Sequence, residues 1–570
     1  MLDVFLDHYY SRRPVNATFT GVHTFDAAMP DWSPDGLEGL RTEMWALRDR
    51  VRREAPPDAA RFPEGVDLQI ADDFLTVQIA ELDSRHFVHR NPSLAVGEAV
   101  FAIMGLLTRP FAPLSERLDV ATVRLSRLPV FLDGARATLA ASPLPPEWVA
   151  KARREIGGAT RFLTAGIDAL LTGTTSDPPL AGPVDAAGVR AAADVALRSF
   201  ADFDAWLLAR PADGRDGAPG CGPDLLDVLL RVGHHERRTR GELLASATEA
   251  FADAEAELGR RVRTLGESSW EGVQRRLAAD HPDTSGYLEE FDRCWRRFHD
   301  AAVRADLVTW TAPPIRYVPI PPQTRDAAPS LYYLFYRSPA PFDRTDIYDY
   351  LVTPIDVSMP VEEQRRRLEA CNRSVIALNH VVHHGGIGHH VQNAHAYRSR
   401  SRLGRIAAVD CASRIGMFSG GSLAEGWACY AVDLMEEIGA LTPLEAAAQQ
   451  HTRLRLLART IVDIGLNQGS LTSETAVQFY RERVGMGPDA ARAEVVKNSM
   501  FPGTACMYWL GTSAIHELRA RCRTRDGAAF SLRRFHDEFL SYGALPVPLI
   551  ASLMTAGSPS PDAPRGAHAP

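Results

Sequence analysis

The feature that most constrains the fold of this 570-residue chain is a three- to four-residue spacing of apolar side chains along most of its length. The spacing is plainest in segments 68–86, 187–207 and 241–265, and the last of these is rich in Ala, Leu and Glu, which favour helix. Two aromatic or β-branched runs flanked by proline, 315–322 and 331–338, predict the strands of a small hairpin or sheet. The sequence therefore predicts a mainly α-helical protein with a minor sheet.

The length allows several ordinary domains or one large helical body with subdomains. A Gly-, Pro- and Asp-rich stretch at 209–223 predicts a boundary between an N-terminal helical subdomain, 1–215, and a second one, 222–556. The second would carry the histidine-rich segment described below and the small sheet near 315–338. The Pro-, Ser- and Ala-rich tail, 557–570, is predicted to be disordered.

Charge and composition argue against several classes of protein. The net charge of −8 gives no support to nucleic-acid binding, which usually needs a basic surface. We see no basic and apolar leader and no run of eighteen apolar residues, so we expect neither a secretory signal nor a membrane span. The seven cysteines are scattered without a CxxC pair, which predicts reduced thiols and a cytoplasmic location.

The segment 379–395, "NHVVHHGGIGHHVQNAH", contains six of the eighteen histidines in the chain. Imidazole is the commonest metal ligand in proteins, but the donors must converge on one ion. On an uninterrupted helix His383 and His390 would lie about 10.5 Å apart along the axis, too far to share an ion. The three glycines of "GGIG" weaken the helix, and a break there could fold His389 or His390 back toward His383.

Two His-His pairs around glycines favour a metal or catalytic site over solvated side chains. His380 and His395, taken singly, are interpreted as ordinary histidines. Downstream, the predicted helix 421–439 places Glu425 near its start. This glutamate is either a metal ligand or a first-turn residue favoured by the helix dipole.

The pairing of "HHGGIGHHVQ" with "AEGWACYAVDLMEEIG" resembles the bacterial domain-of-unknown-function family 885. Its members carry His-Glu-x-x-Pro-Gly-His-His-x-Gln and then Glu-Gly-Trp-Ala-x-Tyr. The opening "YYSRRPVNATFTGVH" and the closing "FPGTACMYWLGTSAIHELRARC" also fit, so the resemblance covers most of the chain. The family is similar to zincin-like metallopeptidases such as neurolysin and the Taq-type carboxypeptidases. The resemblance thus implies a large helical body with a deep cleft and a zinc-type site.

The family motif assigns roles to individual residues. His383 matches its first histidine, His389 and His390 match its closing pair, and Glu425 matches the glutamate of Glu-Gly-Trp. The resemblance implies that the metal ligands come from these four, and which of His389 and His390 faces the metal stays open. Gln392 matches the family glutamine and is expected to contact substrate.

The chain departs from the motif at His384, which stands where the family has glutamate. In metallopeptidases that glutamate is the general base that takes a proton from the attacking water. Histidine can also shuttle protons near neutral pH, or it could become an additional ligand. Together with Ile387 in place of proline and Thr504 in place of glutamine, this change suggests a retuned site in which ordinary peptide hydrolysis is in question.

Two further residues have two interpretations each, and a third is interpreted as structural. Tyr508 either donates to the oxyanion of a tetrahedral intermediate, as a tyrosine does in related peptidases, or is a core aromatic. Lys497 either binds a substrate carboxylate or is a solvated helix end. Asp463 lies inside an apolar helix and needs a partner, for which Arg459 at i−4 is the candidate.

Three functions compete. The first is a metal-dependent hydrolase for a small peptide, amide or ester-like substrate, with one divalent metal, zinc first, and His384 as proton shuttle. The second is a non-hydrolytic iron- or copper-dependent enzyme on the same scaffold, such as a biosynthetic tailoring enzyme. The third is a non-catalytic descendant that binds a peptide or metal. The oligomeric state is left open.

Overall fold

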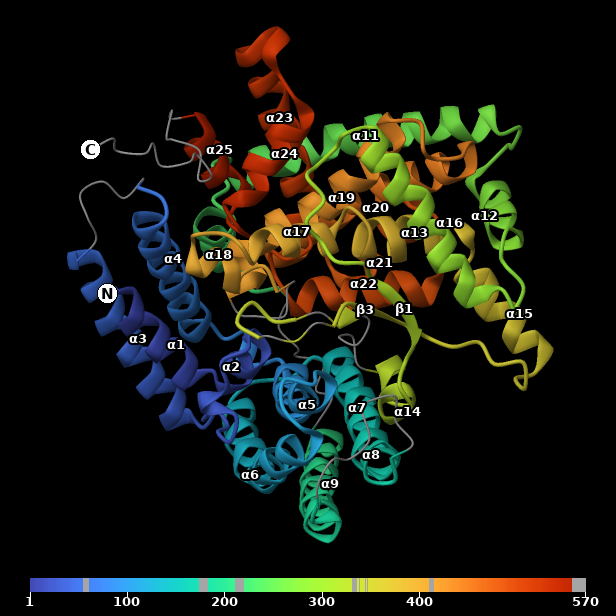
Figure 1. Cartoon of the computed structure of the whole chain (residues 1–570). Coiled ribbons are helices and arrows are strands. Elements are labelled where there is room, and N and C mark those ends of the chain that lie inside the picture. Colours follow the sequence, from blue (N-terminus) through green and yellow to red (C-terminus); the bar gives the residue numbers. More distant parts are fainter. Residues whose placement is uncertain are drawn as a thin grey trace, which may run out of the picture.

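The computed structural model describes residues 1–54, 61–173, 183–210, 220–330, 336–337, 339–343, 345, 347–409 and 415–555. It confirms the mainly α-helical fold with a small sheet (Figure 1). The three segments with the plainest helical spacing correspond to helices α4 (Glu64–Asp83), α9 (Ala186–Leu208) and α11 (Arg240–Thr264). The tail predicted to be disordered lies outside the described residues.

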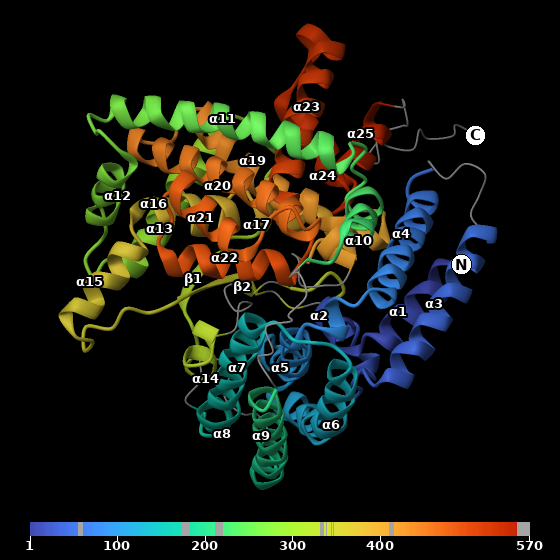
Figure 2. The ribbon, with the colours of Figure 1, turned by 180° about the vertical axis from the view of Figure 1, so that it is seen from behind.

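The N-terminal helices lie on one side of the molecule, blue to teal in Figures 1 and 2. Besides α4 and α9 they are α1 (Leu2–Arg12), α2 (Pro14–Thr20), α3 (Pro34–Glu54), α5 (Pro92–Thr108), α6 (Leu114–Ala140), α7 (Pro146–Arg161) and α8 (Ile167–Leu171). Helices α5 to α9 form most of one hydrophobic core, to which α2, α3 and residues next to the sheet also contribute. Helices α1 and α4 contribute to a larger core shared with the C-terminal helices. The predicted subdomain boundary near residue 215 stays a prediction.

The second half of the chain forms a thicker helical body above this bundle (Figures 1 and 2). Its helices besides α11 are α10 (Pro223–Val228), α12 (Trp270–Ala279), α13 (Tyr287–Arg304), α14 (Pro322–Arg325), α15 (Val361–Ala370), α16 (Arg373–Val375), α17 (His389–Ala396), α18 (Arg402–Ile406), α19 (Gly421–Glu437), α20 (Pro443–Asn467), α21 (Ser473–Arg483), α22 (Pro488–Met500), α23 (Met507–Asp526), α24 (Leu532–Ser541) and α25 (Val547–Thr555). Helices α11 and α20 each begin with a capping box, in which a threonine and the glutamate three residues later satisfy exposed backbone N–H groups. Helix α22 lies on the side of this body that faces α7, and the two are in contact.

The small sheet has three strands in the order β1-β3-β2. Strand β1 (Arg316–Pro319) pairs in parallel with β3 (Asp349–Val352), and β2 (Tyr336–Arg337) pairs with β3 antiparallel. The two predicted runs therefore contribute strands but do not form a hairpin with each other, because β3 separates them. Strand β3 was not predicted, because it is a four-residue run with every side chain buried and no alternation of polar and apolar residues.

Several helices contain π-helical turns, in which the backbone hydrogen bonds span five residues. The longest is η6 (Ile376–Gly385), which holds the first histidines of the histidine-rich segment, and another, η8 (Gly416–Gly420), leads into α19. Such turns occur often at functional sites. The histidine-rich segment and the helix that carries Glu425 thus each adjoin a π-helical, irregular part of the helical body.

Within the described residues, no single helix combines the length and apolarity needed to cross a membrane. One pair, Glu64–His89 with Pro92–Thr108, meets the length and composition requirement together but is bent by 93° at the break.

A partly buried charge network connects the N-terminal helices to the segment before β3. The His23 ring lies 2.8 Å from both Asp26 Oδ2 and Asp343 Oδ1, and it stacks on Phe111. Burial lowers the pKa of His23, but the two carboxylates outweigh it and raise the pKa to about 9. The histidine is therefore charged in the folded protein at neutral pH.

We expect this network to make stability fall as the pH rises. A histidine whose folded pKa is raised contributes its full stabilisation below its unfolded pKa of about 6.5 and loses it as the pH passes 9. Because the side chain is 31 % exposed, we expect a loss of roughly 1–2 kcal/mol in the free energy of unfolding between pH 6.5 and 9.5. Urea melts of the wild type and of His23→Gln across this range measure the difference, and equal slopes would contradict the assignment.

Candidate metal centre

The glycine-rich turn folds the second His-His pair back onto the first. Helix η6 ends at Gly385 and α17 begins at His389, and the Gly388 N–H donates to the Val382 carbonyl at 3.0 Å. A Cβ on Gly388 would lie only 1.9 Å from the His383 carbonyl oxygen, so this approach requires glycine. The fold-back brings the rings of His383 and His389 to a centroid distance of 4.8 Å.

Adding a methyl group at Gly388 should therefore disturb the metal group more than the rest of the fold. We expect Gly388→Ala to lower the free energy of unfolding by about 1–3 kcal/mol, as overpacking does, and to weaken metal binding. Gly97→Ala is the matched control, because Gly97 lies inside α5 with open space where a Cβ would stand and should gain about 1 kcal/mol. Thermal melts and metal titration compare the two, and equal effects would contradict the role of the turn.

Helix α19 brings a carboxylate to the same place. The Trp427 indole Nε1 donates to the Ile387 carbonyl at 2.8 Å and pins the helix to the glycine-rich turn. Glu425 Oε2 then lies 3.3 Å from His383 Nε2 and 3.7 Å from His389 Nε2. Residues 383, 389 and 425 are thus brought together from three elements: η6, α17 and α19.

A very close helix crossing fixes the position of α19. A Cβ on Gly426 would lie 2.5 Å from the Gly511 Cα of α23, and a Cβ on Gly511 would lie 1.8 Å from the Ser422 carbonyl oxygen. Because neither glycine has a side chain, the backbones of α19 and α23 are in direct contact on either side of Glu425 in the sequence. This contact also brings the start of α23, with Tyr508, toward the same region.

The separations among these donor atoms suit a shared metal ion. Two ligands of one tetrahedral zinc ion, each about 2.0–2.2 Å from it, lie about 3.3–3.6 Å apart. The His383–Glu425 and His389–Glu425 separations, 3.3 and 3.7 Å, fall close to that value. A direct charge-assisted hydrogen bond would be shorter, about 2.7–2.9 Å. The residues present therefore fit a metal ion.

His384 is the third imidazole of the group. Its Nδ1 lies 2.7 Å from the Asn379 carbonyl oxygen and so must carry the proton, which leaves the lone pair on Nε2. The ligand nitrogens of His383, His384 and His389 lie within 4.8 Å of one another. A histidine held by a backbone carbonyl in this way has the tautomer and orientation of a metal ligand or of a positioned proton acceptor.

Burial and proximity shift the pKa values in the group. Burial raises the pKa of Glu425, but the contacts with His383 and His389 outweigh this effect and hold its pKa well below the usual value. Burial and the neighbouring His383 and His389 lower the pKa of His384 well below 6.5. The arrangement favours a neutral His384 imidazole and an ionised Glu425 carboxylate, the protonation states in which these two groups can bind a divalent cation.

The structure places His390 away from this group. Its Nε2 lies 2.6 Å from the Pro313 carbonyl oxygen, and its ring packs edge-on against Tyr348. Of the pair left open by the sequence, His389 is therefore the one that meets His383. The other two histidines of the segment make ordinary contacts: the Tyr350 hydroxyl and His380 Nδ1 share a hydrogen bond of 2.7 Å, and His395 Nε2 donates to a backbone carbonyl.

The expected substrate-contacting residues have different surroundings. Gln392 is fully buried in α17, and its amide has no hydrogen-bond partner among the described residues. Tyr508 is partly buried under the Arg459 guanidinium, whose Cζ lies 5.4 Å from the ring centroid. Lys497 is partly buried in α22, three residues after Glu494. Their roles toward substrate stay predictions.

The prediction that Arg459 is the partner of Asp463 is wrong. Arg459 instead forms a bidentate pair with Glu494, with N–O distances of 2.8 and 2.5 Å. Asp463 accepts from the backbone N–H groups of Gly503 and Ala505, each at 3.0 Å, and burial raises its pKa to about 6. Asp463 is therefore structural, and it shapes the loop that leads into α23.

Two residues that the sequence did not single out stand near the group. Cys429 Sγ lies 4.0 Å from His383 Nδ1, one helical turn after Glu425 on the same face of α19. The Tyr350 ring of β3 lies 5.7 Å from the His384 ring, centroid to centroid. The i, i+4 spacing from Glu425 was a signal for Cys429, whereas β3 has no motif that points to Tyr350.

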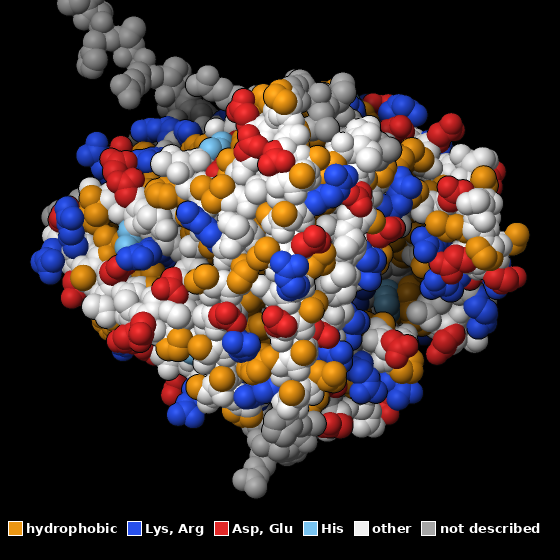
Figure 3. Space-filling view, turned by 90° about the horizontal axis from the view of Figure 1, so that it is seen from below, with side chains coloured by type: hydrophobic (Ala, Val, Ile, Leu, Met, Phe, Trp, Pro, Cys, Tyr) orange, Lys and Arg blue, Asp and Glu red, His pale blue; other side chains and the backbone are white. Residues whose placement is uncertain are grey.

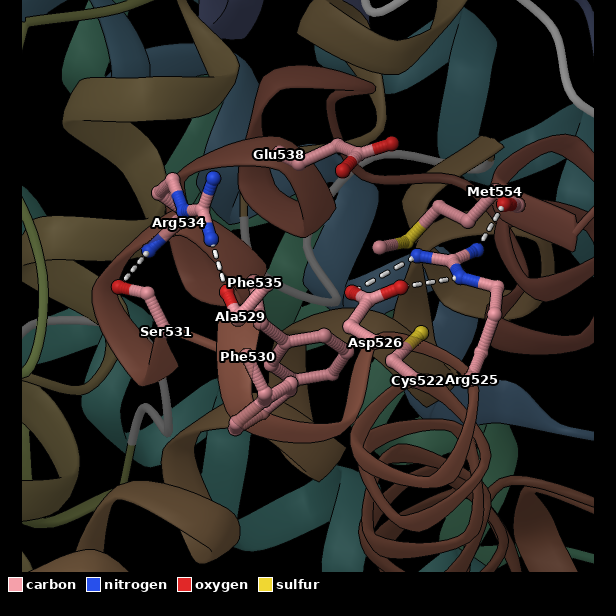
Figure 4. Close-up of a pocket in the computed structure, with 10 residues that line it drawn as sticks. All are labelled: Cys522, Arg525, Asp526, Ala529, Phe530, Ser531, Arg534, Phe535, Glu538 and Met554. Carbon is pink, nitrogen blue, oxygen red and sulfur yellow. Dashed lines mark hydrogen bonds and ion pairs between the residues drawn. The ribbon is translucent and has the colours of Figure 1, made fainter.

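The surface is hollowed where a histidine side chain becomes visible. Figure 3 shows a deep recess with a histidine on its floor and Lys and Arg side chains along its rim. A separate cavity of about 350 Å³ lies between α23, α24 and α25 (Figure 4). In this cavity Arg525 pairs with Asp526 and the Met554 carbonyl, and Arg534 donates to the Ala529 carbonyl. None of the residues of the metal group lines it, so we do not regard it as the functional site.

Fold and site together define a class: a large, mainly α-helical protein in which a three-histidine group beside a buried glutamate could hold a metal ion. The chain belongs to the family described as "Bacterial protein of unknown function (DUF885)", whose model matches residues 14–554. This confirms the family resemblance seen in the sequence. No curated protein matches.

Two solved structures share the fold. One is titled "The structure of a putative lipoprotein of unknown function from Shewanella oneidensis"; it is 20 % identical with a TM-score of 0.76, covering 97 % of this chain and 98 % of that one. The other, "The crystal structure of the putative lipoprotein from Colwellia psychrerythraea", is 16 % identical with a TM-score of 0.75 and the same coverage. Both titles name a "putative lipoprotein", which contradicts the cytoplasmic location predicted from the sequence, and we withdraw that prediction.

Proposed function

We propose that this protein is a metal-dependent hydrolase that acts on a small peptide, amide or ester-like substrate in a recessed cleft. His383, His389 and Glu425 would hold one divalent metal ion, zinc first, and His384 would stand beside it. The observation that carries the proposal is the convergence of these side chains from η6, α17 and α19 at the donor separations of a single coordination sphere.

The motif and the surface support the proposal. The resemblance of the two motif segments to those of zincin-like metallopeptidases assigns the same ligand types in the same order. We take the recess that Figure 3 shows, with a histidine at its floor, to be the entrance to the metal group; such a recess admits small substrates more readily than folded proteins.

When bound, a zinc ion would polarise the substrate carbonyl and lower the pKa of water. The remaining work falls to side chains of the chain itself. His384, with its Nδ1–H held by Asn379, presents Nε2 as the proton acceptor in place of the family glutamate. Glu425 would hold the metal ion together with His383 and His389, and Tyr508 on α23 would donate its hydroxyl to the developing oxyanion.

Metal analysis of protein purified without a histidine tag tests the proposal. We expect about one zinc ion per chain, and removal of the zinc should abolish hydrolysis of small peptide or ester substrates. A chain that retains no metal would contradict the proposal and favour the non-catalytic descendant.

A second candidate is favoured by one specific observation. His384 replaces a carboxylate, so the group has three imidazoles and one carboxylate, a donor set that also suits redox-active iron or copper. A non-hydrolytic metalloenzyme is therefore the alternative, and stoichiometric iron or copper in the same metal analysis would select it.

A further inference from the structure

A second cluster of charged side chains lies beside the metal group. Helix α20 presents Arg455 and Arg459, one turn apart, toward Glu494 and Lys497 of α22. Glu494 is engaged by Arg459 through two hydrogen bonds, and the charges of Arg455 and Lys497 act on it as well. Three cationic side chains thus share one carboxylate, which leaves an excess of positive charge.

Arg455 is the member of this cluster whose hydrogen bonding is incomplete. Its Nε atom is buried and has no hydrogen-bond partner among the residues that the structure describes. Glu494, whose negative charge acts on Arg455, is already bound by Arg459 through two hydrogen bonds. A guanidinium stays charged, and a buried N–H of a charged group is costly without an acceptor. The site therefore favours binding of an anion that is not part of the chain.

Contacts connect the cluster to the metal group. The Arg459 Cζ lies 5.4 Å from the Tyr508 ring centroid, and both Arg455 and Arg459 lie within electrostatic range of the Tyr508 hydroxyl. On the other side, Arg459 lies within electrostatic range of Cys429, whose Sγ is 4.0 Å from His383 Nδ1. Cys429, which lies next to the proposed metal ligand His383, thus connects the charged cluster with the metal group.

We propose that Arg455 binds a free carboxylate of the substrate. The bond next to this carboxylate is thereby presented to the group formed by His383, His389 and Glu425. This inference rests on the proposed function, and it adds the substrate class: small molecules or short peptides with a free carboxylate. Arginine presents a planar fork of N–H donors that matches a carboxylate in two hydrogen bonds. Lys497 of α22 adds a further positive charge near Glu494. The sequence had already made Lys497 a candidate for binding a substrate carboxylate.

The rim of the recess agrees with this charge. With this recess taken as the entrance to the metal group, the Lys and Arg side chains that Figure 3 shows along it would attract an anionic substrate on approach. The chain as a whole has a net charge of −8, so a cationic rim is a local feature and not a consequence of composition.

Binding of a matched pair of peptides tests the inference. The probes are N-acetyl-Ala-Ala with a free C-terminal carboxylate and its C-terminal amide, measured by calorimetry on the zinc-loaded full chain. We expect the acid to bind at least about 10-fold more tightly than the amide, and Arg455→Met to abolish this preference. Arg455→Lys, which keeps the charge without the fork, should retain part of it. A preference that is absent in the wild type or persists in Arg455→Met overturns the inference.

Three controls separate the possible causes. Arg492→Met, which removes one exposed positive charge from α22, should leave the preference intact, and thermal melts show whether each variant folds. Inorganic phosphate as a competitor distinguishes the anion: displacement of the acid peptide by phosphate at lower concentration than by acetate would overturn the choice of carboxylate. Metal content and acid preference are measured on the same samples, so a chain without metal that still prefers the acid contradicts the proposed function and supports the carboxylate site.

Discussion

Replacing His383 with alanine should abolish stoichiometric metal binding while the protein stays folded. His383 supplies a nitrogen 3.3 Å from Glu425, and its ring lies 4.7 and 4.8 Å, centroid to centroid, from the rings of His384 and His389. Changes to groups that merely support a ligand already cost about 10–100-fold in metal affinity, so loss of a ligand should cost more than about 100-fold. Competition titration with a fluorescent zinc chelator measures the affinity, and circular dichroism reports the fold.

His395→Ala is the matched control for this experiment. It removes the same type of side chain from the same histidine-rich segment, but His395 bonds to the Thr309 carbonyl and lies outside the group. We expect it to bind metal like the wild type. If His383→Ala kept its metal, or if His395→Ala lost as much affinity, the proposed metal centre would be wrong.

Substitutions at His384 should change hydrolysis far more than they change metal binding. We expect His384→Ala to retain zinc with less than about a 10-fold loss of affinity and to lower kcat/KM by about 10²–10⁴, the range typical for loss of a general base. His384→Glu restores the family residue and should raise hydrolysis of short peptides above the wild-type rate. Rates are measured against a panel of small peptide and ester substrates at saturating zinc.

The two His384 variants distinguish a proton acceptor from a ligand. Loss of metal in His384→Ala, comparable to that in His383→Ala, would make His384 the third nitrogen ligand and remove it as the base. Hydrolysis that is unchanged in both variants would contradict any role for His384 in the reaction.

Local pattern predicted much of the fold, because helices reveal themselves through apolar spacing within one segment. The segments that became α4, α9 and α11 were readable in this way. Strand β3 was not, because its four residues are all buried and its partner β1 is distant in the chain. A sheet that depends on pairing between segments far apart in the chain has no local signature comparable to that of a helix.

The site was partly predictable for the same reason. The break at "GGIG" indicated that a second histidine could return to His383, and the backbone approach at Gly388 shows why glycine is needed there. The choice between His389 and His390 could not be read, because it depends on the Pro313 carbonyl far upstream, which takes up His390. Arg455 was missed because its role depends on the pairing of Glu494 with Arg459. This pairing results from tertiary packing and has no signal in the sequence.

The most direct test of the account is to locate the metal. Anomalous diffraction at the zinc edge, on crystals of the untagged full-length chain, should show one peak within about 2.0–2.3 Å of nitrogen atoms of His383 and His389 and an oxygen atom of Glu425. A peak elsewhere in the molecule, or no peak with these three side chains hydrogen-bonded directly to one another, would contradict it.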